Sequence, residues 1–354
     1  MERFWKISLL LLSGYLLAVM LMNPEVCMNA ASSALLLCFE TVIPALFPFF
    51  VCSHLLIDLG AAGLLSRYLS PLMRPLFGIP GSGALAVVLG LVSGYPVGAE
   101  CIVGLYTSGN CSRSEAERML TFCNNSGPLF VMGAVGVGML GAREIGGLLY
   151  LIHAISALLT GMLFRRYGKE TTLQSLALPA GKPLPNPIFA FGTAVADGVT
   201  AILKVCGFVV LFAVVTSALP QDSAPLYALL EITGGIARMV EMGSFGQGLL
   251  PMVSFFLACS GVSVLMQAAA IVLPAGLSLK PYLLGKLTQG CLACGLTALA
   301  LQFVPISTPS FAGEVGVFLP NGFALLCYAG MMLLWSLCFL AAFCFALWLY
   351  DHHK

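Results

Sequence analysis

Four clusters of glycine, proline and small polar residues interrupt otherwise apolar sequence, and they contain the side chains best suited to chemistry. Each half of the chain has two: Ser93-Gly94-Tyr95-Pro96 and Asn124-Asn125-Ser126-Gly127-Pro128, then Thr233-Gly234-Gly235 and Ser260-Gly261-Val262-Ser263. Such residues free backbone N–H and C=O groups, which lipid cannot satisfy. At membrane depth they must be buried in protein or line a wet cavity. Breaks that recur in two halves indicate the binding site of a transporter.

The chemistry expected of these clusters is the binding of a small polar or anionic molecule. A half-helix N-terminus presents unpaired N–H groups and the positive end of the helix dipole to an anion. Amide and hydroxyl groups from the Asn cluster suit carboxylates, carbonyls or ring nitrogens. The alternative role is structural, since Ser and Asn also hydrogen-bond between helices in lipid. The predicted substrate-binding set is Ser93, Gly94, Tyr95, Pro96, Asn124, Asn125, Ser126, Gly127, Thr233, Gly234, Ser260, Gly261 and Lys204.

Lys204 belongs to this set because it lies in the middle of the apolar segment 188–219. An ionisable group at that depth is costly and marks a functional candidate. Asp197 precedes it by seven residues, so both lie on one helical face. A structural Asp197–Lys204 pair, or a snorkelling lysine, is the alternative. The candidate coupling carboxylates are Glu40, Glu100, Asp197 and Glu231, each of which could instead have a hydrogen-bonded structural role.

The sequence contains no HExxH, GxSxG or Walker A arrangement. We therefore expect no enzyme activity, no catalytic residues and no cofactor, and ATP-driven transport would require a partner chain. Cys291 and Cys294 form the only CxxC pair, with no second pair or histidine nearby, so no metal site is predicted. His54 and His153 are single and unpaired, and they are predicted to be structural.

The composition is that of a polytopic membrane protein. Of the 354 residues, 59% are apolar and 9% are charged, and the mean hydropathy is +0.99, whereas soluble domains carry about 25% charged residues. The net charge of +1 gives no indication of nucleic-acid binding. Residues 1–22 could be read as a cleavable signal, but an uncleaved first helix with a cytoplasmic N-terminus fits the length of the apolar run better.

Apolar lengths and the placement of Lys and Arg predict the topology. The segments of the first half are a helix 7–22, a turn at Asn23-Pro24-Glu25, a helix 35–57, an interfacial helix 64–77, a re-entrant hairpin 85–105, a broken helix 114–140 and a helix 145–164. A polar junction at 170–187 follows. The second half has a helix 188–219, a hairpin 226–239 broken at Thr233–Gly235, a broken helix 250–275, a helix 283–303, an outer loop and a final helix 323–350. Lys280 and Lys286 are predicted on the cytoplasmic side.

The predicted fold class is an all-α polytopic membrane protein with about eight transmembrane helices plus two re-entrant hairpins. Both halves read helix, hairpin, broken helix, helix and begin on opposite sides of the membrane, which predicts an inverted repeat. Frequent Gly and Pro in membrane helices would be the simpler explanation. The predicted divisions are an N-terminal helix (1–34), a first repeat (35–169), a linker (170–187), a second repeat (188–303) and a C-terminal loop and helix (304–354).

Several motifs resemble a known family. They are Pro71-Leu72-Met73-Arg74-Pro75-Leu76-Phe77, Pro80-Gly81, Ser93-Gly94-Tyr95-Pro96-Val97-Gly98-Ala99, Ser114-Glu115-Ala116-Glu117-Arg118 and Asn125-Ser126-Gly127-Pro128-Leu129-Phe130. In order and spacing they are similar to the YlbJ family of sporulation integral membrane proteins, within the nucleoside recognition, or Gate-domain, group related to concentrative nucleoside transporters. The likeness covers about residues 35–165 and is looser beyond, where it includes Lys204-Val205-Cys206-Gly207-Phe208. The family position of Glu100 is usually basic, which argues against a direct role of Glu100 in anion binding.

The resemblance implies an endospore-former and a transporter in the mother-cell membrane around the forespore, which moves dipicolinic acid out of the mother-cell cytosol. Dipicolinate is a small aromatic dianion, and helix N-termini, Asn amides and Lys204 suit it. A nucleoside or another small anion is the alternative substrate, because the Gate fold alone does not fix it. A non-transporting sporulation scaffold is the alternative class of protein. Besides substrate and lipid, a homo-oligomer or sporulation membrane partners are compatible with the sequence.

Overall fold

The computed structural model describes residues 2–59, 61–168, 186–217, 219, 224–243 and 248–303. Every regular element in these ranges is a helix, as the sequence predicts. The predicted outer loop and final helix, and nearly all of the linker, lie outside the described residues.

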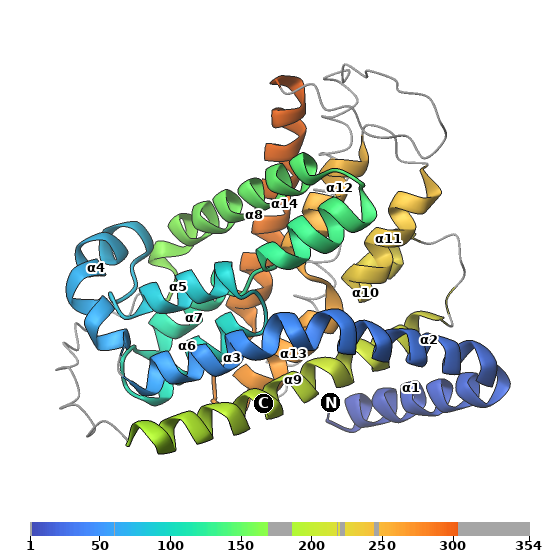
Figure 1. Cartoon of the computed structure of the whole chain (residues 1–354), viewed down its shortest axis with the longest axis horizontal. Helices are drawn as coiled ribbons and strands as arrows, with labels where there is room; N and C mark the ends of the chain where they lie inside the picture. The colour runs from blue at the N-terminus through green and yellow to red at the C-terminus, as the bar shows by residue number, and fades with distance from the viewer. Residues whose placement is uncertain are drawn as a thin grey trace.

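The N-terminal helices form a long arm along one side of the molecule. Helix α1 (Glu2–Met22) turns back into α2 (Pro24–Leu37), and a π-helical segment (Cys38–Val42) leads on to α3 (Ile43–Asp58). Helices α2 and α3 both pack against α9 (Pro187–Ser217), so the start of each half lies side by side (Figure 1). The expected turn at Asn23-Pro24-Glu25 is shorter than predicted, because proline is well tolerated in a first helical turn and α2 begins at Pro24 itself.

The remaining elements of the first half follow the predicted order. Helix α4 (Ala61–Phe77) precedes the hairpin of α5 (Gly83–Val92) and α6 (Val97–Thr107). Helix α7 (Arg113–Leu120) is separated by the Asn cluster from a π-helix (Leu129–Met139), and α8 (Arg143–Leu163) completes the half. The breaks predicted at Ser93–Pro96 and Asn124–Pro128 are therefore confirmed as interruptions of helix.

The second half contains a second hairpin and a second broken helix. Its elements are α10 (Ala224–Leu230), α11 (Ile232–Met242), α12 (Leu249–Cys259), α13 (Gly261–Val272) and α14 (Lys280–Phe303). The break at Ser260-Gly261 is confirmed. The break predicted at Thr233–Gly235 is wrong by two residues: the chain breaks at Glu231, and Thr233 and Gly234 lie in the first turn of α11. The Glu231 carboxylate caps that turn, accepting from the N–H of Thr233 at 2.9 Å and of Gly234 at 2.7 Å.

Gly235 is a packing residue. A Cβ atom there would lie 2.1 Å from the Ala228 Cα, so glycine lets α11 approach α10. The glycine at this position therefore marks a close contact between two helices and not a helix break.

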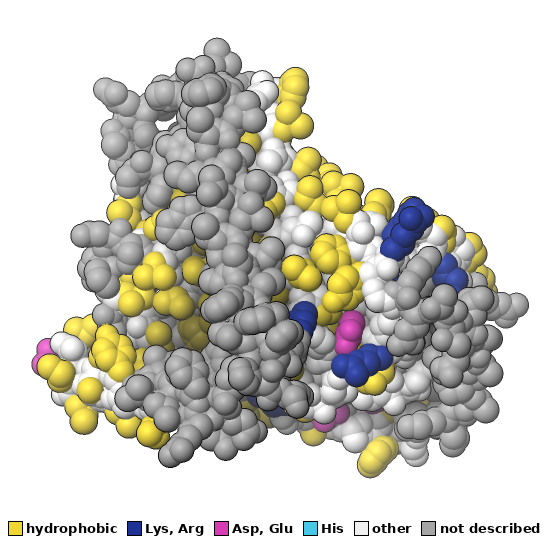
Figure 2. Space-filling model, turned by 180° about the vertical axis from the view of Figure 1, so that it is seen from behind, with side chains coloured by type: hydrophobic (Ala, Val, Ile, Leu, Met, Phe, Trp, Pro, Cys, Tyr) yellow, Lys and Arg dark blue, Asp and Glu magenta, His cyan; other side chains and the backbone are white. Residues whose placement is uncertain are grey.

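Four stretches among the described residues are long and apolar enough to cross a membrane: Arg143–Arg166, Pro187–Ser217, Leu249–Val272 and Lys280–Phe303. Figure 2 shows broad hydrophobic areas with few charged side chains on the described part of one face. These features are those of an integral membrane protein.

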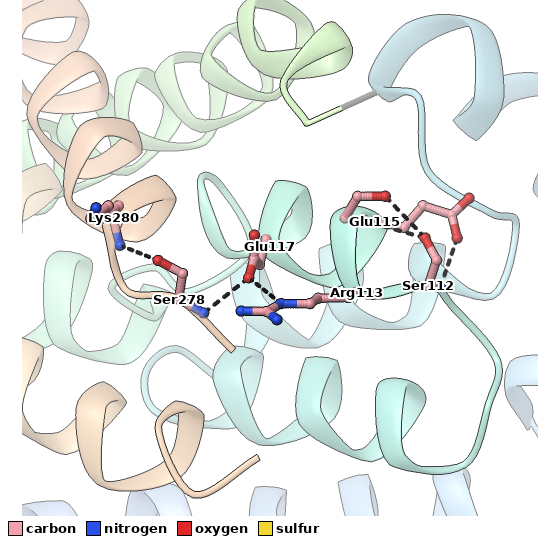
Figure 3. Close-up of polar contacts among 7 residues, drawn as sticks. Ser112, Arg113, Glu115, Glu117, Ser278 and Lys280 are labelled. Carbon is pink, nitrogen blue, oxygen red and sulfur yellow. Dashed lines mark hydrogen bonds and ion pairs between the residues drawn. The ribbon is translucent and has the colours of Figure 1, made fainter. Parts of the chain in front are cut away.

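Polar contacts tie the start of α7 to the start of α14 (Figure 3). The Ser112 side chain and Glu115 form a capping box at the N-terminus of α7. One turn on, Glu117 Oε1 accepts from the Ser278 N–H at 3.0 Å and from Arg113 Nε at 3.0 Å. Because Ser278 lies two residues before α14, this carboxylate joins the two halves at one end of the bundle.

Candidate functional site

The first two breaks pack against each other through glycine. A Cβ atom on Gly94, where φ is +87°, would lie 2.7 Å from the Gly127 nitrogen. A Cβ atom on Gly98 would lie 2.0 Å from the Cys123 carbonyl oxygen. The backbones meet without intervening side chains, and the Ala99 N–H donates to Asn124 Oδ1 at 3.3 Å. The α5–α6 hairpin tip is thereby fixed on the broken helix that follows it.

The other two breaks are also neighbours. Ser260 adopts a left-handed conformation with φ of 68°, as does Gly261 after it. A Cβ atom on Gly261 would lie 3.2 Å from the Leu229 carbonyl oxygen and 3.3 Å from that of Ala228. The junction of α12 and α13 therefore lies against the C-terminal end of α10, next to Glu231.

Buried side chains of the Asn cluster connect the two halves. Ser126 Oγ donates to the Leu257 carbonyl at 3.0 Å, and Asn124 Nδ2 donates to Tyr282 Oη at 3.2 Å. Asn125 Oδ1 accepts from Lys286 Nζ at 3.1 Å and from Gln289 Nε2 at 3.0 Å. All three cluster residues are fully buried. Their hydrogen bonds satisfy polar groups that would otherwise be costly in an apolar interior.

A cavity of about 130 Å³ lies where the breaks converge. Its polar lining comes from Ser93, Tyr95, Glu231, Thr233, Ser263 and Gln267, together with backbone at Gly94 and Gly127. Its apolar lining includes Val42, Leu46 and Phe49 from the N-terminal arm and Val205 and Val209 from α9. Apolar walls with a few polar groups are typical of small-molecule sites.

Two buried polar atoms of this lining have no hydrogen-bond partner within the described structure: Ser93 Oγ and Gln267 Oε1. Their side chains are 3% and 5% exposed. Buried polar atoms are almost always paired, so unpaired ones in a cavity wall are positions where a ligand can bind.

The other predicted substrate-binding residues are not in this lining. Seven of them lie in or beside the breaks, where they supply the packed backbone and hydrogen bonds behind the cavity. These are Pro96, Asn124, Asn125, Ser126, Gly234, Ser260 and Gly261. Lys204 is on α9 next to Val205, but its own side chain is exposed and lies outside the lining. Among the described residues no ion pair joins it to Asp197, whose side chain is also exposed.

The candidate coupling carboxylates occupy different environments. Glu231 lines the cavity. Glu100 lies 3.5 Å from His54 Nε2, so the prediction of an unpaired His54 is wrong. Glu40 is exposed in the π-helical segment.

The sequence reasoning missed polar residues on one face of α14. Tyr282, Lys286 and Gln289 are buried and all contact the Asn cluster. Lys286, which was predicted on the cytoplasmic side, has a side chain that is 2% exposed and donates to Asn125. The spacing of four and then three residues, which places these side chains on one helical face, is the signal that could have found them. His153, predicted to be structural, also contacts the Asn cluster, because its Nε2 accepts from the Ser126 N–H at 3.1 Å.

Comparison with known proteins agrees with the architecture. The Gate family model, described as nucleoside recognition, matches residues 39–196, which include the first hairpin and the Asn cluster. The chain is thus a Gate-domain membrane protein. It is 31% identical to the sporulation integral membrane protein YlbJ of Bacillus subtilis strain 168, over 81% of each chain. The chain belongs to the YlbJ family. No solved structure matches it significantly.

Proposed function

We propose that the protein is a transporter that moves dipicolinic acid out of the mother-cell cytosol across the outer forespore membrane during endospore formation. The observation that carries the proposal is the convergence of four helix breaks around one cavity. Family membership supports a sporulation role in a membrane, and broken helices that meet at a cavity are the usual architecture of a carrier's binding site.

The two halves are proposed to form an inverted repeat with about eight transmembrane helices and two re-entrant hairpins. The element order supports this: α3, α5–α6, α7 with its π-helix, and α8 correspond to α9, α10–α11, α12–α13, and α14. Alternating access would then expose the cavity to one side of the membrane at a time.

The size of the cavity favours a one-ring substrate. Its volume of about 130 Å³ is close to the roughly 150 Å³ that admits benzene into an apolar protein cavity. Dipicolinate has a single ring, whereas a nucleoside has a base and a sugar and would require the cavity to widen. Backbone and hydroxyl groups at Ser93, Gly94 and Gly127 are suited to its carboxylates.

Glu231 is the proposed coupling carboxylate, because it is the one member of the predicted coupling set that lines the cavity. Its oxygens bind the N–H groups of Thr233 and Gly234, so a change in its protonation would alter the cap of α11. Substrate binding and proton transfer would then act on the same helix end.

The test is uptake of labelled dipicolinate into liposomes that contain the purified protein, with nucleosides as competitors. We expect dipicolinate flux that excess nucleoside leaves largely unchanged. Asn125→Ala should abolish flux at normal protein levels, because it removes the acceptor shared by Lys286 and Gln289. Uptake of nucleosides without dipicolinate flux would refute the substrate, and full flux in Asn125→Ala would refute the role given to this residue.

A further inference from the structure

Lys286 on α14 is a lysine buried in the protein interior. The side chain is 2% exposed, and its Nζ donates to Gln289 Oε1 at 2.8 Å and to Asn125 Oδ1 at 3.1 Å. Both acceptors are neutral amides. Among the described residues no ion pair joins Lys286 to a carboxylate. A lysine at such a position is costly and calls for a functional reason.

The charge lies where α14 meets both broken helices. A Cβ atom on the neighbouring Gly285 would lie 2.2 Å from the Thr121 carbonyl oxygen, at the end of α7. On the other side, Cys259 Sγ donates to the Lys286 carbonyl at 3.6 Å, at the end of α12. Lys286 is thus held by backbone contacts between the second and fourth breaks.

Asn125 links Lys286 to the cavity. The Asn125 side chain binds Lys286 Nζ, and its backbone oxygen lies 3.5 Å from the Cβ position of the cavity-lining Gly94. Gly127, two residues further on, also lines the cavity. In an interior of low dielectric constant, a charge this close affects the binding of any charged ligand.

We infer that Lys286 is the fixed positive charge that makes the site prefer anions, acting on the substrate through Asn125 as a positioning residue. The inference rests on the proposed transport function and deepens it by naming the charge class of the substrate. Two of the three ammonium donors bind amide oxygens, which are neutral. The negative charge that balances Lys286, which the described residues do not provide, comes from a substrate carboxylate.

Glu231 does not provide that counter-charge. Its carboxylate binds the N–H groups of Thr233 and Gly234 at the N-terminus of α11, where the helix dipole already balances a negative charge. The Lys286 charge therefore remains available to the ligand.

The experiment compares liposome uptake of dipicolinate with uptake of its uncharged diamide. Lys286→Met removes the charge and keeps an unbranched apolar stem, and Lys286→Arg keeps the charge. Arg143→Gln, an exposed charge in the first turn of α8, is the matched control. We expect Lys286→Met to lower the preference for the anion over the amide about tenfold or more, a change of about 1.4 kcal/mol or more. Lys286→Arg should retain most of the preference, and the control all of it.

If Lys286 is purely structural, its substitution lowers uptake of both compounds equally. An unchanged ratio of anion uptake to amide uptake in Lys286→Met therefore overturns the inference, while the proposed transport function still stands. Replacement of a buried ion by an apolar residue is often tolerated. If Lys286→Met does not fold, Lys286→Gln, which keeps a donor for Asn125, gives the same comparison. If the wild type carries neither compound, the proposed function fails. Binding of both compounds is then measured by calorimetry. If the anion does not bind, or binds no more tightly than the amide, the proposed role of Lys286 is refuted.

Discussion

The close contact between the first two breaks can be tested with one added methyl group. Gly98 lies in the first turn of α6, and an alanine there would place its Cβ 2.0 Å from the Cys123 carbonyl oxygen and 3.0 Å from the Asn124 Cα. Ordinary contacts begin at 3.4 Å. Helix α6 would have to move by more than 1 Å to relieve the overlap. That movement would break the hydrogen bond from the Ala99 N–H to Asn124.

The expected effect is the sum of three contributions. Overpacking a close contact costs about 1–3 kcal/mol, and the lost hydrogen bond costs about 1 kcal/mol. Alanine is favoured over glycine within a helix by about 1 kcal/mol, which offsets part of this cost. Gly98→Ala should therefore lower the free energy of unfolding by about 1–3 kcal/mol and reduce flux, because the cavity wall is displaced.

Gly207→Ala on α9 is the matched control. Nothing lies within 4 Å of its Cβ position, so the same substitution should raise stability by up to about 1 kcal/mol and leave flux unchanged. Thermal unfolding in detergent and uptake at matched protein levels measure both effects. The reasoning would be refuted if the two variants shifted stability in the same direction, or if Gly98→Ala transported normally.

Three further substitutions address other contacts. Ser260→Gly should raise stability by about 1 kcal/mol, because a left-handed conformation strains a residue with a side chain; a lower unfolding temperature would show that the hydroxyl matters more than the strain. Glu117→Ala should lower the free energy of unfolding by about 1–2 kcal/mol through loss of its bonds to Ser278 and Arg113; unchanged unfolding in detergent would contradict a link between the halves. Glu231→Gln should remove the response of uptake to an imposed pH gradient while leaving substrate binding; a response equal to that of the wild type would exclude Glu231 as the coupling group.

Local sequence signals predicted most of the helices and three of the four breaks. Proline combined with glycine and small polar residues disfavours regular helix, so Ser93–Pro96 and Asn124–Pro128 could be found without tertiary information. The break near Thr233 was misplaced because glycine occurs both at helix breaks and at close helix–helix contacts. Gly235 permits close packing on Ala228 inside a regular helix, and only the tertiary contact distinguishes this from a break.

Lys286 was missed for a different reason. Lysine near the end of an apolar segment is normally taken as the membrane boundary, and its interaction with Asn125 spans 161 residues of sequence. The side-chain partner that turns a boundary lysine into a buried one is visible only once α14 is packed against the Asn cluster. Lys204 is the converse case: its side chain is exposed and outside the cavity lining, because depth along a helix does not reveal which face contacts the cavity.

The contacts around α14 also indicate which part of the cavity can open. Glycine lets α14 meet the broken helices closely, with Gly285 against the Thr121 backbone and Gly290 against Cys259, where an added Cβ would lie 2.5 Å from Sγ. Separating these surfaces would also break the buried hydrogen bonds from Lys286 and Gln289 to Asn125, which is costly. The part of the cavity lining that comes from α3 and α9 consists of apolar side chains, which can repack without exposing an unpaired polar group. We therefore expect access to the cavity to open along the α3–α9 wall, while α14 and the broken helices keep the charge of Lys286 in place.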